Sequence, residues 1–213
     1  MEHDPHYASS AALAPIRVWD WTVRASHWTL AAAFLTAYAT SESESLRLIH
    51  NTAGLISMAA VLYRVVWGFV GSRHARFAGF LKSPLRALQY LRSLASDKPE
   101  HFTGHNPAGG WAVLGLLGLA LLTAGTGLAN DRELGGSLVE KAHDLFANLA
   151  IALVVLHLVA VALSSFLHKE NLVKPMIWAR KLGFKAEEIP ARAGLVGALI
   201  FVVWVAGFVA WLR

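Results

Sequence analysis

The chain has no cysteine among its 213 residues. This absence excludes disulfide bonds, iron–sulfur clusters, thiolate ligands and the covalent attachment of a c-type haem. Any metal that the protein binds must therefore be held by nitrogen or oxygen atoms.

Charged residues are also scarce, at 15% of the chain, whereas 55% of the residues are apolar and the mean hydropathy is +0.46. This composition is typical of a membrane protein with a single domain. Four charge-poor segments are long enough to cross a hydrocarbon core of about 30 Å: 51–70, 109–129, 144–166 and 192–212. A fifth, 26–40, is shorter and needs the preceding residues RVWDWTVRASHW to reach the headgroups. We predict an all-α integral membrane fold with five helices.

The start of the chain lacks a basic region followed by an apolar core, so it does not resemble a cleaved signal peptide, and we expect the first helix to stay as an anchor. Lysine and arginine collect in alternate connecting segments, and by the positive-inside rule these segments belong on the cytoplasmic side. The residues concerned are Arg17, Arg24, Arg73, Arg76, Lys82, Arg86, Arg92, Lys98, Lys169, Lys174, Arg180, Lys181, Lys185 and Arg192. We predict a cytoplasmic N-terminus and a periplasmic C-terminus. The net charge of +5 reflects this topology, and no basic patch interleaved with aromatic residues indicates a nucleic-acid partner.

Ten histidines are present, and the predicted topology sorts them by depth. Three lie in polar stretches and are expected at the surface: His3, His6 and His74. Three more lie at the cytoplasmic boundary: His101, His105 and His168. The remaining four lie at or inside the edges of predicted membrane helices: His27, His50, His143 and His157.

His143 and His157 are the most informative pair, because fourteen residues separate them in one apolar stretch. In an α-helix this spacing places both imidazoles on one face, about 21 Å apart along the axis. Histidine is costly in lipid, so the pair suggests two sites at two depths. Depth then pairs His50 with His143 near the outer side, and His27 with His157 near the cytoplasmic side.

Two imidazoles on opposite sides of a plane suit a haem iron, whereas zinc or copper normally needs three or four converging ligands. Gly54 and Ala147 follow His50 and His143 by one turn and leave room for a flat macrocycle, although small residues also serve ordinary helix packing. Hydrogen-bonded packing histidines are the ordinary alternative. A proton relay in a transporter is another, but it would be expected to bring buried Asp or Glu, and the predicted helix interiors contain none.

Arg64 follows His50 by fourteen residues and is expected on the same helix face, near the depth of His27 and His157. A charge at that depth needs a partner, which a haem propionate would supply. Alternatively, the side chain extends toward the cytoplasmic headgroups beside Trp67. In the following loop, Ser83 and Pro84 predict the start of a short amphipathic helix, either at the membrane interface or as a simple connector.

Several stretches resemble the bacterial di-haem cytochrome b561 family, which is related to the b-type cytochrome subunit of nickel–iron hydrogenases. They are RVWDWTVRASHW (17–28), LIHNTAGL (48–55), YRVVWGFVGSRHARFAGF (63–80), GHNPAGGW (104–111) and 142–177. The resemblance implies a four-helix haem bundle over 17–178, after an N-terminal tail of 1–16 and before a linker and fifth transmembrane helix in 179–213. It also implies two non-covalent haem b groups held by His27, His50, His143 and His157, in agreement with the pairing by depth.

The resemblance implies electron transfer across the bacterial inner membrane, between a periplasmic redox protein such as a c-type cytochrome and a quinone, ubiquinone being expected. Some cytochromes of this type pass electrons from superoxide to ubiquinone, and that is an alternative. A haem-free transporter or structural membrane protein is a further alternative. His105 and Asn106 are candidates for the quinone site, and a helix-capping role for this segment is equally consistent with the sequence.

Overall fold

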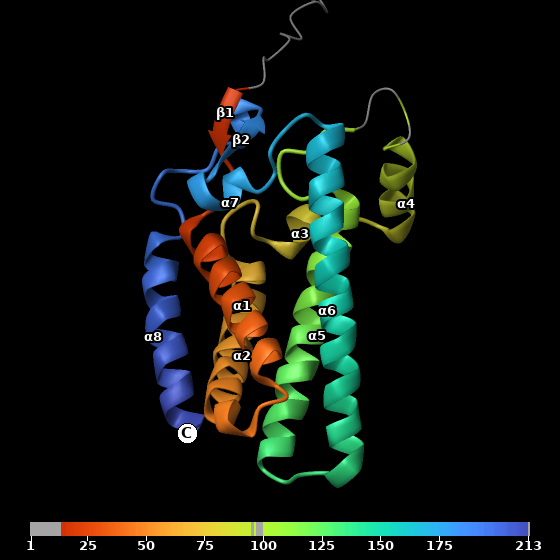
Figure 1. Ribbon diagram of the computed structural model, residues 1–213. Helices are drawn as coiled ribbons and strands as arrows, with labels where there is room; N and C mark the ends of the chain where they lie inside the picture. Colours follow the sequence, from red (N-terminus) through yellow and green to blue (C-terminus); the bar gives the residue numbers. More distant parts are fainter. Residues whose placement is uncertain (1–13, 95, 97–99, 213) are drawn as a thin grey trace, which may run out of the picture.

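Five long helices run up and down side by side in the computed structural model (Figure 1), which describes residues 14–94, 96 and 100–212. His3, His6 and most of the predicted N-terminal tail lie outside the described residues. The long helices are α1 (Trp21–Thr40), α2 (Arg47–Val70), α5 (Pro107–Asp131), α6 (Gly136–Leu167) and α8 (Leu195–Leu212). The short elements are α3 (Phe77–Phe80), α4 (Pro84–Ser93), α7 (Lys174–Trp178) and the strands β1 (Ala14–Arg17) and β2 (Arg180–Gly183).

Four helical segments are long and apolar enough to cross a membrane: Glu44–Val70, Pro107–Asp131, Gly136–Leu167 and Leu195–Leu212. The chain is therefore a multi-pass membrane protein. Helix α1 has 20 residues and lies alongside these helices, but it is more polar. Its crossing of the membrane, and with it the fifth span, stays a prediction.

Side-chain caps explain where several helices begin. The Asp20 carboxylate accepts a hydrogen bond from the backbone N–H of Val23 at 2.7 Å, so α1 begins at Trp21, five residues before the predicted segment. Ser83 caps α4 and is followed by Pro84, which confirms the short helix predicted there. Helix α6 begins at Gly136, two turns before His143, so the prediction that His143 lies at the start of its helix was wrong.

A small antiparallel sheet pairs the first described residues with the segment that follows α7, which the expectation of an all-α fold had missed. Ala14 pairs with Gly183 and Arg17 with Arg180. Ile16 and Val18 are fully buried in the cluster of apolar side chains beside this sheet. The sheet therefore fixes the segment that leads into α8 next to the start of α1.

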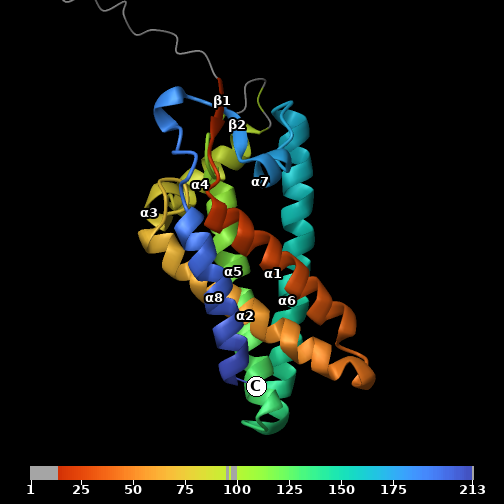
Figure 2. The same cartoon turned by 90° about the vertical axis from the view of Figure 1, so that its left-hand side faces the viewer.

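Helix α2 lies at the centre of the bundle, where it packs against α1, α5 and α8, and α5 packs in turn against α6. In the second view, α8 lies in front of α2 (Figure 2). Hydrogen bonds fix α8 in place: Tyr63 Oη donates to the Gly197 carbonyl at 2.7 Å, and Trp204 Nε1 donates to the Ala59 carbonyl at 2.9 Å. Gly194, with a φ of +71°, lies so close to Asp20 that a side chain at this position would clash with it.

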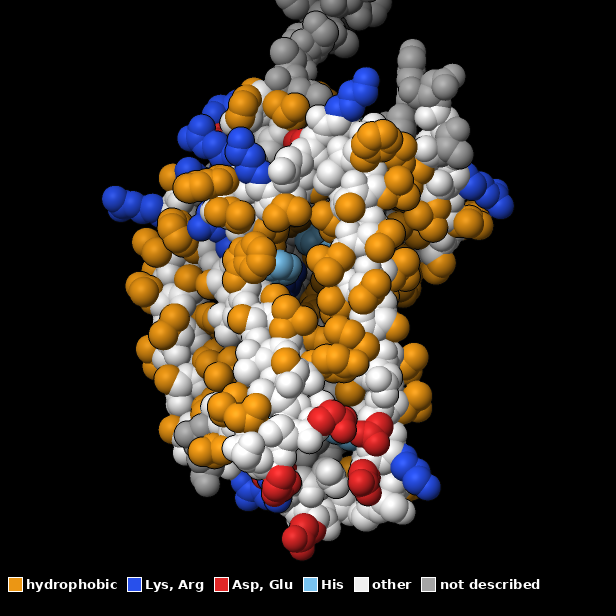
Figure 3. Space-filling model, viewed as in Figure 1, with side chains coloured by type: hydrophobic (Ala, Val, Ile, Leu, Met, Phe, Trp, Pro, Cys, Tyr) orange, Lys and Arg blue, Asp and Glu red, His pale blue; other side chains and the backbone are white. Residues whose placement is uncertain are grey.

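Charge separates between the two ends of the bundle, and apolar side chains cover much of the surface between them (Figure 3). We call the end that carries residues 71–106 and 168–194 the basic end, and the end formed by the 41–46 and 132–135 turns the acidic end. The acidic end carries Glu42, Glu44, Asp131, Glu133, Glu140 and Asp144. This asymmetry follows the loop pattern read from the sequence.

Candidate functional site

His50 of α2 and His143 of α6 face each other near the acidic end. Their ring centroids lie 6.2 Å apart and the ring planes are nearly perpendicular, at 83°. Two imidazoles that bind one metal ion from opposite sides, with metal–nitrogen bonds of about 2 Å, have their ring centres about 6 Å apart. The structure thus brings together the two residues that were paired by depth, at a separation that one metal ion would span.

Hydrogen bonds orient both of these rings. His50 Nδ1 lies 2.8 Å from the Ala37 carbonyl oxygen, and His143 Nδ1 lies 2.9 Å from the Thr123 carbonyl oxygen. Because a carbonyl oxygen only accepts, each Nδ1 carries the proton and donates it. The lone pair of each neutral imidazole is then on Nε2, the arrangement of a histidine prepared to bind a metal.

The backbone around this pair leaves room for the rings and for a flat group beside them. A Cβ atom at Gly127 of α5 would lie 2.8 Å from His143 Cε1, so the absence of a side chain there gives the imidazole its place. A Cβ atom at Gly54, one turn after His50, would have nothing within 4 Å. The space predicted beside Gly54 is therefore present in the structure.

His27 of α1 and His157 of α6 form the second predicted pair, closer to the basic end. They lie within range of a direct electrostatic interaction. His27 Nδ1 is buried and has no hydrogen-bond partner among the described residues. The space-filling view shows histidine side chains deep in a hollow between α1 and α6 (Figure 3). An unsatisfied ring nitrogen beside a hollow fits a site that a bound group completes.

Arg64 is buried on α2, with 7% of its surface exposed, so its guanidinium does not extend to the headgroups. Nη2 donates to the Ala75 carbonyl at 3.3 Å, and the Phe77 ring lies 5.7 Å from the guanidinium carbon. Nη1 is buried and without a partner in the described part of the chain. A buried cation with an unused donor fits an anionic group that binds nearby.

The donor set suits a haem better than a bare ion. Within residues 14–94, 96 and 100–212, no group of three or more histidine, aspartate or glutamate side chains converges as a metal-ion site. A haem needs only two axial protein ligands, because its macrocycle supplies the other four nitrogens. The facing pair His50 and His143, and the pair His27 and His157 within electrostatic range of each other, fit that requirement.

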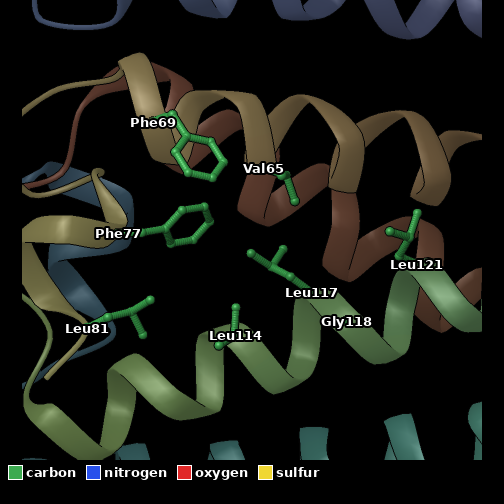
Figure 4. Close-up of a pocket in the computed structure, with 8 residues that line it drawn as sticks. All are labelled: Val65, Phe69, Phe77, Leu81, Leu114, Leu117, Gly118 and Leu121. Carbon is green, nitrogen blue, oxygen red and sulfur yellow. The ribbon is translucent and has the colours of Figure 1, made fainter. Parts of the chain in front are cut away.

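A separate cavity of about 320 Å³ lies between α2, α3 and α5 (Figure 4). Its lining is apolar throughout and includes Val65, Phe69, Phe77, Leu81, Leu114 and Leu117. No polar group is available there to orient a substrate, so this cavity is no candidate for the site of chemistry.

The sequence singled out the four histidines as candidates but did not reveal the groups that orient His50 and His143. The Ala37 and Thr123 carbonyls belong to the backbone, and their positions depend on helix packing that no local pattern reveals. Asn106 caps α5 by accepting a hydrogen bond from Gly109 N–H at 2.7 Å, which confirms the capping role considered for that segment. His74 was expected at the surface, but it is half-buried and its Nε2 lies 2.9 Å from the Glu187 carbonyl.

Comparison with known proteins gives a consistent result. A family model described as prokaryotic cytochrome b561 matches residues 18–179. A probable Ni/Fe-hydrogenase B-type cytochrome subunit from Rhizobium leguminosarum bv. viciae is 25% identical, over 82% of this chain and 89% of its own length. The probable Ni/Fe-hydrogenase 1 B-type cytochrome subunit of Escherichia coli K12 is 28% identical, over 54% of this chain and 57% of its own. No solved structure matches the chain.

Proposed function

The chain belongs to the prokaryotic cytochrome b561 family, and we propose that it binds two haem b groups and transfers electrons between a periplasmic redox protein and the quinone pool. Membership of a b-type cytochrome family implies haem b and membrane electron transfer, and removes the haem-free transporter from consideration. The observation that carries the di-haem proposal is the facing pair His50 and His143, with both Nδ1 protons donated to backbone carbonyls.

His50 and His143 would hold the outer haem, and His27 and His157 would hold the inner haem. A haem held by two histidines would supply one-electron transfer chemistry. The protein's residues orient the imidazoles through the Ala37 and Thr123 carbonyls and keep both sites within apolar surroundings. Arg64 would hold a propionate of the inner haem through its unused Nη1 donor.

The proposed orientation follows from charge. The basic end would face the cytoplasm and the acidic end the periplasm, with the N-terminus inside and the C-terminus outside. Helix α1 would then be a fifth crossing, because α2, α5, α6 and α8 alternate in direction and α1 runs antiparallel to α2 (Figure 1). The proposed domain organisation is a haem bundle over 17–178, preceded by the tail of 1–16 and followed by a linker and the fifth helix in 179–213.

The acidic end supports a protein partner rather than superoxide. An anionic substrate would need free cations near the outer haem. Arg47 is ion-paired to Glu44 at 3.3 Å. The other two cations of this end, Arg132 and Lys141, are outnumbered by its remaining carboxylates, namely Glu42, Asp131, Glu133, Glu140 and Asp144. A periplasmic electron carrier such as a c-type cytochrome is therefore the partner that we propose, with ubiquinone as the membrane substrate.

Absorption spectroscopy of the purified, haem-supplied protein tests this function. We expect two b-type signals in the reduced-minus-oxidised spectrum and two haems per chain. His143→Ala should remove the outer haem and spare the inner one, and His27→Ala should do the reverse, because each variant removes one axial ligand of one pair. Asn148→Ala, on an exposed face of α6, is the control and should retain both haems. A wild-type preparation without haem bands would refute the proposal, and retention of both haems in either histidine variant would refute the pairing.

A further inference from the structure

Four ionisable side chains meet at the basic end: His101, His168, Glu170 and Lys181, which we call the basic-end cluster. Their segments are distant in sequence, namely the approach to α5, the end of α6 and strand β2. Glu170 Oε2 lies 3.5 Å from His101 Nε2 and 3.8 Å from Lys181 Nζ. The rings of His101 and His168 have centroids 6.2 Å apart.

The cluster has an unused acceptor at its centre. Glu170 Oε1 accepts a hydrogen bond from the Leu182 N–H at 3.0 Å, but Oε2 is buried without a hydrogen-bond partner within the described residues. Lys181 donates instead to the Phe102 carbonyl at 2.5 Å. Glu170 Oε2 thus has two nitrogens nearby, but neither donates a hydrogen bond to it. A proton bound by the cluster would supply the missing hydrogen bond.

The charges of the cluster favour reversible binding of a proton. Burial lowers the pKa of His168, and the positive charges of His101 and Lys181 lower it further, whereas Glu170 raises it. Burial also lowers the pKa of Lys181. Other ionisable groups that face the cluster are Tyr90 of α4, whose hydroxyl lies 3.4 Å from His168 Nε2, the Arg86–Glu100 pair and His105. The carboxylate of Glu170 thus stabilises the protonated forms of His168 and Lys181, whose pKa values are lowered by burial.

The cluster also connects water with the inner histidine pair. The His101 side chain is 29% exposed, whereas those of Glu170 and Lys181 are 13% and 8% exposed, so a proton from water would enter through His101. His168 follows His157 on the same run of chain by eleven residues, which is about 16 Å along a helix. A charge added at the level of His157 would therefore change the proton affinity of the cluster.

We propose that the basic-end cluster is a proton-binding site that takes up a proton from the adjacent aqueous phase when the haem that His27 and His157 would hold is reduced. The inference rests on the proposed function. The electron comes from the outer haem and its donor, and the proton comes from water. Both leave together when a quinone is reduced, because each electron that a quinone accepts to become quinol is matched by one proton.

The size of the effect follows from the distance. For two unit charges about 16 Å apart at an effective dielectric constant of about 20, the proton affinity of the cluster changes about fivefold. For a one-electron couple, a fivefold change converts to about 40 mV. Because reduction favours the protonated cluster, the inner potential should fall as pH rises.

Spectroscopic redox titration of the haem-loaded protein between pH 5 and 8 tests this inference. We expect the inner potential of the wild type to fall by about 40 mV and the outer potential to change less. Glu170→Gln should abolish the fall, because it removes the anion that holds the proton, and His168→Asn should reduce it at least by half. Glu188→Gln, which removes a carboxylate elsewhere at the same end, is the matched control and should behave as the wild type.

Infrared difference spectra between the reduced and oxidised protein give a second measurement. They should show a protonation change of a carboxyl or imidazole group that is lost in Glu170→Gln and in His168→Asn. An inner potential independent of pH in the wild type overturns the inference, as does an unchanged fall in both variants or an equal loss in Glu188→Gln. Each of these outcomes presupposes two haem signals. Absence of the haems would refute the proposed function instead.

Discussion

A histidine that binds a metal uses one ring nitrogen, so the hydrogen bond of the other nitrogen decides which one is available. At His50 and His143 that bond goes to a helix carbonyl on a neighbouring element, Ala37 in α1 and Thr123 in α5. The orientation of each ring therefore depends on how the helices pack. A small displacement of α5 would move the ring of His143, even though no residue of α5 is a proposed ligand.

Gly127 allows a direct test of this dependence. Gly127→Ala would place a methyl group 2.8 Å from His143 Cε1, which must push the imidazole out of position. Overpacking of this kind costs roughly 1–3 kcal/mol. We expect weaker retention of the outer haem and an altered outer potential, measured by haem content and redox titration.

Gly125→Ala is the matched control, because a Cβ atom at Gly125 has nothing within 4 Å. It makes the same change on the same helix and should leave both haems in place. Equal behaviour of the two alanine variants would show that the position of the His143 ring does not depend on Gly127.

His105 predicts a loss of stability in acid. Burial, followed by the positive charge of Arg64, lowers its pKa from 6.5 to about 3. Between these values the unfolded chain binds a proton that the folded protein does not, so the free energy of unfolding falls as pH falls. From pH 7.5 to 5 the loss is about 2 kcal/mol.

Thermal unfolding in detergent at the two pH values would measure this loss. His105→Phe keeps a ring between Trp19 and Phe80, which pack against His105 at 4.7 and 4.4 Å, and it removes the titrating group. The variant should lose less stability than the wild type on acidification. The same acid sensitivity in both proteins would assign the effect to other groups.

Helix α6 is the element that both proposed sites share, since it carries His143 and His157 on one face. Its inward positions recur every three or four residues and include Ala147, Ala150 and Ser164. The sequence was sufficient to predict this face, because a fourteen-residue spacing on an apolar helix is a local property. Depth along the predicted helices also paired this face with His50 and His27. The sequence was not sufficient to predict the backbone carbonyls of Ala37 and Thr123, which orient His50 and His143.

The positions of the long helices could be predicted from apolar length, but the small sheet could not. Strands β1 and β2 have four residues each and pair across more than 160 positions of the chain. Neither strand shows a run long enough to indicate a strand by itself. The early start of α1 had a readable signal, because Asp20 immediately precedes the helix and is a preferred capping residue.

Helix α8 is held by hydrogen bonds that a lipid-facing anchor would not need. Trp204→Phe removes the indole N–H that donates to the Ala59 carbonyl, so this hydrogen bond between α8 and α2 is lost. We expect a loss of about 0.5–1.5 kcal/mol in thermal unfolding. Trp211→Phe makes the same change at a position of α8 that is 79% exposed, and it should reduce the thermal stability less. Equal effects would mean that the Trp204 bond adds nothing to the docking of this helix.

For the whole molecule, the separation of charge predicts its orientation in the membrane. The absence of cysteine makes this simple to test, because one introduced cysteine is the only thiol in the chain. Ser45→Cys lies at the acidic end and Ser96→Cys at the basic end, and both serines are exposed. An impermeant thiol reagent added outside the inner membrane should label Ser45→Cys at once and Ser96→Cys only after lysis. The reverse pattern would invert the proposed topology.

The hollow between α1 and α6 has a consequence for how the protein matures (Figure 3). Helix α1 packs against α2 and α8, whereas α6 packs against α5. Each wall of the hollow is therefore supported by other helices of the bundle. Its mouth opens on the side of the bundle and not at an end. Haem dissolved in the bilayer can therefore enter laterally after the helices have been inserted, without separation of α5 from α6. We therefore expect chain insertion and cofactor loading to be successive steps, with lipid as the medium from which the cofactor is delivered.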